Sequence, residues 1–464
     1  MSSVEMLPRV LAACEANQDR DLADLLRLLR QPSISAQDIG VTECAALFQE
    51  AVTAAGLSAE LFPTDRHPMV FGERSGPASS PTLLLYGHYD VQPPEPLDAW
   101  QSPPFEPEIR DGRIYARGAG DNKGQFFAHL AALRAWHETV GELPINVKIL
   151  VEGEEETGSP HLDETVAKHR DRFQADLVVT SDGPIYADGR PLIKYGVRGM
   201  LYIELRTRGA NRDLHSGNWG GVAPNPIWTL IRLLGTMMDS ENRITVPGIM
   251  ENVRQPSASV RAALDTLAAT TDVQETLETI GTDTLPPPDK RPLHDRLMVQ
   301  PTMNIAGFTG GYGGPGSKTV IPSEAVVKMD LRLVPDQDPD KIFAALQAHV
   351  ANHAPEVDIV RMGSMRPSAT PIDHPLAAAV REAVRQGFGA DPVDVPSAGG
   401  SLPDAAWTRT LGLPSFVVPY ANHDEGNHGP NENLVLDRFF AGIRTTATLL
   451  ATLASGNHSA LQIS

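Results

Sequence analysis

Four short apolar segments, residues 83–86, 147–151, 177–180 and 416–418, each lead into a turn that carries acidic residues or histidine. Valine, leucine and isoleucine dominate them, which is typical of strands buried on both faces of a mostly parallel sheet. Helical stretches between them, such as residues 123–137, can supply the crossovers. Ligands of such sheets bind beyond the carboxyl ends of the strands. The pattern therefore predicts an α/β fold with helices on both faces of the sheet and a polar site at one edge.

The length of 464 residues predicts more than one domain, because single cores stop growing at roughly 250–300 residues. From residue 199 to 365 the pattern changes to alternating segments and helices in a β-α-β-β-α-β order, which is typical of a ferredoxin-like α+β domain. The strand pattern with polar turns resumes after this stretch. We therefore expect a first domain of residues 1–198 and 366–464, interrupted by an inserted α+β domain of residues 199–365.

The charge balance excludes two classes of partner. The chain has 39 basic and 58 acidic side chains, a formal net charge of −19, whereas nucleic acids and anionic membranes require clustered Lys and Arg. The longest apolar runs are far shorter than the ~20 residues that span a bilayer, and the N-terminal residues do not resemble a secretory signal. Two cysteines, Cys14 and Cys44, suit a reducing compartment. These features predict a cytoplasmic protein without nucleic-acid or membrane partners.

Several side chains in the polar turns are candidate ligands, although each has a structural alternative. A polar turn would explain His88 and Asp90, and helix capping would explain Asp121. Asp182 and His428 carry weak signals on their own. Together these turns bring two histidines and at least three carboxylates from five segments, a donor set that suits Zn²⁺, Mn²⁺ or Co²⁺.

The acidic run at residues 154–156 strengthens this interpretation. Such a run is normally solvated, but here it follows a segment that should be a buried strand. Like charges at the edge of a sheet repel one another, so a cationic group should hold them, and a pair of metal ions would suffice.

Other catalytic motifs do not explain these turns. Residues 118–124 are rich in glycine, but this loop matches neither G-x-x-x-x-G-K-[ST] nor G-x-G-x-x-G. The G-x-S-x-G elbow of serine hydrolases and the H-E-x-x-H zinc motif are missing too.

These residues resemble the family of di-metal hydrolases that contains carnosine and Cys-Gly dipeptidases, aminoacylase, acetylornithine deacetylase and carboxypeptidase G. The resemblance covers almost the whole chain and rests on residues 86–93, 117–124, 155–158, 181–182 and 428–432. The Y-G-H-Y-D-V-Q-P form of the first motif is most similar to the dipeptidase branch, as are residues 213–217, 318–322 and 331–335.

The resemblance implies a catalytic domain with two divalent metal ions, Zn²⁺, Mn²⁺ or Co²⁺. Asp121 would bridge the ions. His88 and Asp182 would complete the ligand set of one ion, and Glu156 and His428 that of the other. Asp90 would hydrogen-bond the far nitrogen of His88, as carboxylates behind metal ligands do, and Glu155 would be the general base.

The inserted domain is then similar to the family's lid and dimerisation domain, which implies a homodimer. His215 resembles the histidine that stabilises the oxyanion in the partner subunit's site. Arg332 matches the position that pairs with the substrate's carboxylate, and Thr319 and Ser401 lie in motifs that line the substrate pocket. A surface imidazole and a strand salt bridge are the structural alternatives for His215 and Arg332. Two departures from the dipeptidase pattern, Gly183 after Asp182 and Gly429 after His428, remove no ligand.

The resemblance favours metal-dependent hydrolysis of dipeptides. An N-acyl-amino-acid deacylase or a carboxypeptidase with the same metals is the alternative. A metal-free dimeric binding protein is a further alternative, against which the complete set of ligand-type residues argues. The preferred substrate, the metal and a role for residues 247–300 do not follow from the sequence.

Overall fold

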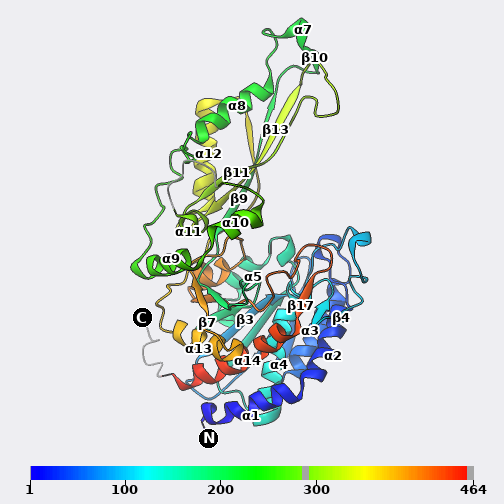
Figure 1. Ribbon diagram of the computed structural model, residues 1–464, viewed down its shortest axis with the longest axis vertical. Helices are drawn as coiled ribbons and strands as arrows, with labels where there is room; N and C mark the ends of the chain where they lie inside the picture. Colours follow the sequence, from blue (N-terminus) through cyan, green and yellow to red (C-terminus); the bar gives the residue numbers. More distant parts are fainter. Residues whose placement is uncertain (1, 285–291, 457–464) are drawn as a thin grey trace. The chain divides into compact units, whose positions relative to one another are not determined.

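The structure is a computed structural model that describes residues 2–284 and 292–456 and forms two compact units (Figure 1). Unit 1 contains the residues up to 196, residues 369–395 and those from 403 onward. Unit 2 contains residues 197–368 and 396–402. Residues 285–291, which belong to the segment 247–300, lie outside the described residues.

Unit 1 is built on an eight-stranded sheet with the order β1-β2-β6-β3-β7-β16-β8-β15. The four segments singled out in the sequence are the neighbouring strands β6, β3, β7 and β16, and these pair in parallel. Their carboxyl ends therefore meet at one edge, and the predicted mostly parallel α/β fold is confirmed. The strands of the sheet are β1 (Ser58–Phe62), β2 (Met69–Arg74), β3 (Thr82–His88), β6 (Asn146–Glu152), β7 (Leu177–Thr180), β8 (Leu192–Lys194), β15 (Val393–Val395) and β16 (Ser415–Val417).

Helices cover both faces of this sheet, as the continuous apolar strands require. On one face Leu84 and Tyr86 of β3 share a core with Leu162 of α5 and with Trp407. On the other face α3 and α4 pack against the strands, and α4 also packs against α14 (Figure 1). The helices of unit 1 are α1 (Ser3–Ala16), α2 (Gln18–Leu29), α3 (Val41–Ala54), α4 (Lys123–Val140), α5 (Leu162–Lys168), α6 (Arg170–Phe173), α13 (Ala377–Phe388) and α14 (Leu436–Ser455), with short turns at Ser35–Gln37, Leu97–Ala99, Glu155–Thr157 and a π-helix at Ala406–Leu411.

A small antiparallel sheet connects two loops of unit 1 that are far apart in the sequence. It consists of β4 (Glu108–Arg110), β5 (Arg113–Tyr115) and β17 (Asn433–Val435), in the order β17-β5-β4. Because β5 pairs with β17, the loop that follows β5 lies beside the loop that precedes β17.

Unit 2 has the predicted β-α-β-β-α-β core. Its antiparallel sheet has the order β11-β13-β9-β14 and is formed by β9 (Gly199–Arg208), β11 (Thr302–Gly310), β13 (Glu324–Leu333) and β14 (Asp358–Met365). Helices α8 (Pro226–Met237) and α12 (Pro339–His353) pack on this sheet (Figure 1). Alternate residues of β9, namely Leu201, Ile203 and Leu205, are fully buried in the core that the sheet shares with these helices.

Further elements of unit 2 lie between these core elements. The segment 247–300 contains α9 (Ala258–Thr270), α10 (Val273–Ile280) and α11 (Leu293–Met298), and a two-stranded sheet pairs β10 (Leu214–His215) with β12 (Val320–Ile321) next to α7 (Ser216–Trp219). The short segment 396–402 joins unit 2 through a bridge between Val197 and Ala398 and through Arg198, whose guanidinium donates to the carbonyl of Gly399. Among the described residues, no helix is both long and apolar enough to cross a membrane.

Candidate metal centre

The candidate ligands lie in the loops at the carboxyl ends of the central strands. His88 is the last residue of β3, Glu156 lies in the turn that follows β6, and Asp182 follows β7 by two residues. Asp121 lies two residues before the start of α4, and His428 lies between β16 and β17. The sheet topology therefore brings together side chains from five separate segments of the sequence.

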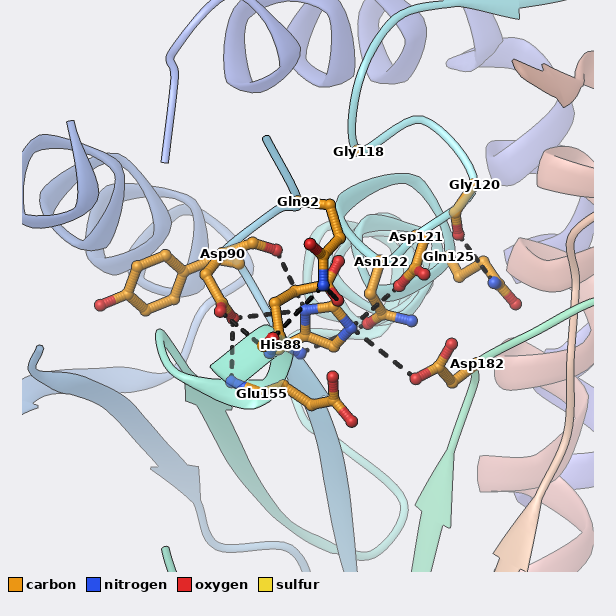
Figure 2. A network of polar contacts seen from close by, with 12 residues as sticks. His88, Asp90, Gln92, Gly118, Gly120, Asp121, Asn122, Gln125, Glu155 and Asp182 are labelled. Atoms are coloured by element: carbon orange, nitrogen blue, oxygen red, sulfur yellow. Dashed lines mark hydrogen bonds and ion pairs between the residues drawn. The ribbon is translucent and has the colours of Figure 1, made fainter. Parts of the chain in front are cut away.

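The first group of three possible ligands consists of His88, Asp121 and Asp182 (Figure 2). The Nε2 atom of His88 lies 3.1 Å from Oδ1 of Asp121 and 3.7 Å from Oδ2 of Asp182. All three residues are buried. This nitrogen forms no hydrogen bond of good geometry with the described residues, so it is free to act as a ligand.

A second group shares Asp121 with the first. The Nε2 atom of His428 lies 3.2 Å from Oδ2 of Asp121 and 3.3 Å from Oε2 of Glu156. In each group the ligand atoms all lie within 4.8 Å of one another. Asp121 thus turns one carboxylate oxygen toward each group, which is the arrangement that a residue shared by two cations requires.

The backbone at His428 is unusual. Its φ angle is 58°, in the left-handed region that residues other than glycine seldom adopt. Such conformations persist where the surrounding structure imposes them, often at functional sites. The conformation directs the imidazole toward Asp121 and Glu156.

The electrostatics of the two groups suit divalent cations. Contacts with Asp121 and Glu156 raise the pKa of His428 to about 10. Burial alone would lower the pKa of His88, but its contacts with carboxylates, Asp121 first, raise it well above the usual value. Both shifts show that the surrounding field is strongly negative. A set of imidazole nitrogens and carboxylate oxygens in such a field fits Zn²⁺, Mn²⁺ or Co²⁺.

Asp90 contacts the ring nitrogen of His88 that does not face the ligand group. The Nδ1 atom of His88 lies 3.0 Å from the backbone carbonyl oxygen of Asp90 and 3.4 Å from its Oδ1 atom. The Asp90 carboxylate also accepts hydrogen bonds from the backbone N–H groups of Glu155 and Glu156, at 3.2 and 3.1 Å. Asp90 therefore connects the end of β3 to the turn after β6 (Figure 2).

Glu155 lies beside the two groups but belongs to neither. Burial raises the pKa of Glu155 well above its usual value, and the negative charges of Asp182, Glu156 and Asp121 raise it further, whereas His88 acts in the opposite direction. A carboxylate whose pKa is raised is a stronger base than an ordinary carboxylate, which suits proton transfer.

The structure adds polar partners to which the sequence analysis gave no role. The Nε2 atom of Gln92 donates to Oε2 of Glu156 at 2.9 Å. Asn122 donates to the carbonyl of Ser181 at 2.6 Å, and Ser35 donates to Oδ2 of Asp90 at 2.6 Å. Gln92 and Asn122 lie inside the motifs at residues 86–93 and 117–124, so their position in the sequence could have identified them as residues of the site. Ser35 lies outside them and had no such signal.

The remaining predicted residues form two pairs in unit 2. Thr319 Oγ1 lies 3.4 Å from Nε2 of His215, and the His215 Nδ1 atom accepts a hydrogen bond from the backbone N–H of Gly217 at 3.0 Å. Arg332 donates to Oγ of Ser401 at 3.2 Å. These four side chains belong to a different unit from the two ligand groups.

Arg198 is a further cation beside Arg332 that the sequence analysis did not single out. Burial and then the charge of Arg332 lower the pKa of Arg198 to about 10. Arg332 also pairs with Asp330, whose Oδ2 atom lies 3.4 Å from its Nε atom, so the strand salt bridge is present and the two guanidinium groups carry one excess positive charge beside it.

Comparisons with known proteins agree with this geometry. Residues 84–452 match the model of peptidase family M20/M25/M40. The Cys-Gly metallodipeptidase dug1 of Schizosaccharomyces pombe is 30% identical and aligns over 84% of this chain and 83% of its own length. The Beta-Ala-His dipeptidase of Homo sapiens is 31% identical, over 83% of this chain and 78% of its own.

Solved structures share the fold over nearly the whole chain. The M20 family metallo-carboxypeptidase Sso-CP2 of Sulfolobus solfataricus is 34% identical with a TM-score of 0.87, covering 94% of this chain and 99% of its own. The dipeptidase Dug1p of Saccharomyces cerevisiae is 26% identical with a TM-score of 0.82, covering 98% and 100%.

Asp121→Asn tests whether the two groups hold metal ions. Because Asp121 offers an oxygen to both groups, we expect the variant to lose about 100-fold or more in affinity for Zn²⁺ or Mn²⁺, since even residues behind the ligands contribute about 10–100-fold. Isothermal titration of chelator-treated protein measures this affinity. The exposed Asp65 lies outside both groups, and Asp65→Asn is the matched control that should bind as the unmodified protein does. Unchanged binding by Asp121→Asn would contradict the assignment.

Proposed function

The chain belongs to peptidase family M20/M25/M40, and on that premise we propose that it is a metallodipeptidase that hydrolyses the peptide bond of unblocked dipeptides. The observation that carries the proposal is the position of Asp121, with one oxygen in each ligand group. The named dipeptidases among its relatives, which align over more than four-fifths of the chain, support the substrate class.

Each ion would have one histidine and two carboxylates as ligands. His88 and Asp182 would hold one ion, Glu156 and His428 the other, and Asp121 both. Two bound divalent ions supply Lewis-acid chemistry, since they polarise a carbonyl group and acidify water. Zn²⁺, Mn²⁺ and Co²⁺ all suit these ligands.

The roles of Asp90 and Glu155 follow from their contacts. With its Nδ1 atom against two oxygens of Asp90, His88 carries its ring proton on Nδ1 and presents the Nε2 lone pair to the ligand group. Glu155 is the general base. It takes a proton from the attacking water and passes this proton to the leaving amine, and its backbone is fixed by the hydrogen bond to Asp90.

Unit 2 supplies the groups that recognise the substrate. Because the Nδ1 atom of His215 accepts a backbone hydrogen bond, its Nε2 atom carries the proton and can donate to an oxyanion, an interaction typically worth ~3 kcal/mol. Arg332 binds the free carboxylate of the substrate through its guanidinium fork, and Thr319 and Ser401, which contact His215 and Arg332, also contact the substrate.

We further propose that unit 2 forms a homodimer, in which His215 serves the partner subunit's site. Strand β11 is an edge strand of the sheet, and its Ile305 and Phe308 are 53% and 42% exposed. Both point to the helix-covered face, because they pair with the core residues Met329 and Val327. On α8, Trp228 is also 56% exposed. Exposed apolar side chains on an edge strand favour a protein–protein contact.

The cytoplasm is the compartment that we propose for the enzyme. Cys14 and Cys44 are both free and buried, and unpaired thiols suit a reducing environment.

Carboxypeptidase activity, or deacylation of N-acyl amino acids, is the second candidate function. The solved structure with 34% identity and a TM-score of 0.87 is described as a metallo-carboxypeptidase. The same ligand groups and the same base would serve this reaction, so the substrates rather than the metal ions distinguish the candidates.

A substrate panel separates these candidates. We expect unblocked dipeptides to be hydrolysed with a kcat/KM at least about tenfold higher than that of N-acetyl and N-succinyl amino acids or N-blocked peptides, a difference of about 1.4 kcal/mol in the barrier. Release of free amino acid is measured with Zn²⁺, Mn²⁺ and Co²⁺ in parallel. Turnover of blocked substrates alone would establish the second candidate instead.

Glu155→Gln tests the general base. The variant should bind divalent ions as the unmodified protein does but lose about 10²–10⁴-fold in kcat, the usual contribution of acid–base catalysis. Ion content and turnover are measured on the same preparation. Near-normal turnover would remove Glu155 from this role.

Ile305→Glu tests the dimer. A charge placed at the proposed contact should convert the dimer into a monomer, as measured by light scattering after gel filtration. Met362 is 52% exposed on β14, the opposite edge strand, so Met362→Glu is a control of equal exposure that should remain dimeric. A dimeric Ile305→Glu variant, or a monomeric unmodified protein, would contradict the proposal.

A further inference from the structure

Glu432 is a fully buried carboxylate that none of the proposed catalytic steps uses. Its Oε1 atom accepts hydrogen bonds from the backbone N–H groups of Gly120 and Asp121, both at 2.9 Å, and of Gly118 at 3.1 Å. Its Oε2 atom accepts a hydrogen bond from Nη1 of Arg117 at 2.7 Å. Backbone N–H groups of one loop that converge in this way form a binding site for an anion, and here a side chain of the same chain occupies it.

The donors and the acceptor come from distant parts of the sequence. Strand β5 pairs with β17, and the ladder continues with a hydrogen bond from the N–H of Ala116 to the carbonyl of Glu432 at 3.1 Å. The loop that leaves β5 carries Asp121, and the loop that enters β17 carries His428, four residues before Glu432. Glu432 therefore lies where the two loops meet.

The conformation of the loop at residues 117–121 depends on its glycines. Gly118 has a φ angle of +88°, which favours glycine. A Cβ atom at Gly120 would lie 2.4 Å from Oε2 of Glu425. The loop can thus direct three N–H groups at one carboxylate only because these two positions lack side chains.

Arg117 completes the charge balance of this contact. It is buried, and its guanidinium also lies over the ring of Trp100 and donates to the carbonyl of Pro93 at 3.3 Å. A buried carboxylate is stable when it is paired and fully hydrogen-bonded, and Glu432 meets both conditions.

We propose that Glu432 is a positioning residue of the metal centre, which fixes the backbone of Asp121 so that its carboxylate offers one oxygen to each ligand group. The inference rests on the proposed metal centre. The hydrogen bond from the N–H of Asp121 to Glu432 fixes the backbone position of Asp121. The pairing of β5 with β17 keeps the loop of Asp121 beside the loop of His428. The carboxylate of Glu432 thus fixes the position of Asp121, the residue that the two groups share.

Glu432→Gln is the direct test. The amide cannot accept hydrogen bonds on both sides, so its NH₂ group must face either Arg117 or the backbone N–H groups, and the loop is no longer held. We expect the affinity for Zn²⁺ or Mn²⁺ to fall about 10–100-fold, as for other residues behind metal ligands, and the absorption spectrum of the Co²⁺-loaded protein to change. Asp424→Asn is the matched control, because Asp424 lies in the same loop as His428 but pairs with Arg113 at the surface.

The outcomes separate a positioning role from a general contribution to stability. Circular dichroism and the melting temperature show whether the Glu432→Gln variant is folded. If it is folded and its affinity for Zn²⁺ or Mn²⁺ stays within about threefold of that of the unmodified protein, the inference is overturned. A lower melting temperature without a change in ion affinity or in the Co²⁺ spectrum would do the same. If the unmodified protein binds no divalent ion, the proposed function fails as well, and this result is distinct from the other two.

Hydrogen exchange gives a second test that needs no variant. In the metal-free protein, the amides of Gly118, Gly120 and Asp121 should exchange slowly, because Glu432 accepts their hydrogen bonds before any ion binds. Mass spectrometry of the peptide that spans residues 117–122 measures this protection. Exchange at the rate of an unprotected loop in the folded protein would overturn the inference even if Glu432→Gln does not fold.

Discussion

The concentration of negative charge at the carboxyl edge of one mostly parallel sheet is the constraint on which the rest of unit 1 depends. Parallel strands end at the same edge, so the loops after β3, β6 and β7 place Asp90, Glu156 and Asp182 close together. Buried carboxylates repel one another and lose their hydration. The fold is therefore stable only if each of these groups has a partner, and the partners divide the carboxylates into two kinds.

Carboxylates of the first kind are satisfied by the protein itself. Asp90 accepts hydrogen bonds from two backbone N–H groups and from Ser35, and Glu432 accepts them from three N–H groups and Arg117. Those of the second kind, Asp121, Asp182 and Glu156, have mainly histidine nitrogens as neighbours. The first kind shapes the loops, and the second kind forms the two groups that could hold cations. This division explains why one edge of a sheet can hold so many acids and still present a defined site.

The sequence predicted the features that depend on local patterns. Apolar runs revealed β3, β6, β7 and β16, and the turns after them supplied the candidate ligands. Contacts between distant segments could not be predicted in the same way. Neither the contact of Ser35 with Asp90 nor the association of residues 396–402 with unit 2 has a periodic signature. The division of the Asp121 oxygens between two groups depends on a backbone that Glu432 holds from 311 residues away.

In the proposed function, the separation into two units also separates chemistry from recognition. The two ligand groups and Glu155 all belong to unit 1. In the proposed mechanism, metal ions held there would polarise whichever amide bond is presented to them. His215, Arg332 and Ser401 belong to unit 2. Relatives described as dipeptidases and as a carboxypeptidase match the same chain over most of its length. Under the proposed function, we therefore expect a change of substrate class within this fold to come from unit 2 and not from the carboxylates at the sheet edge.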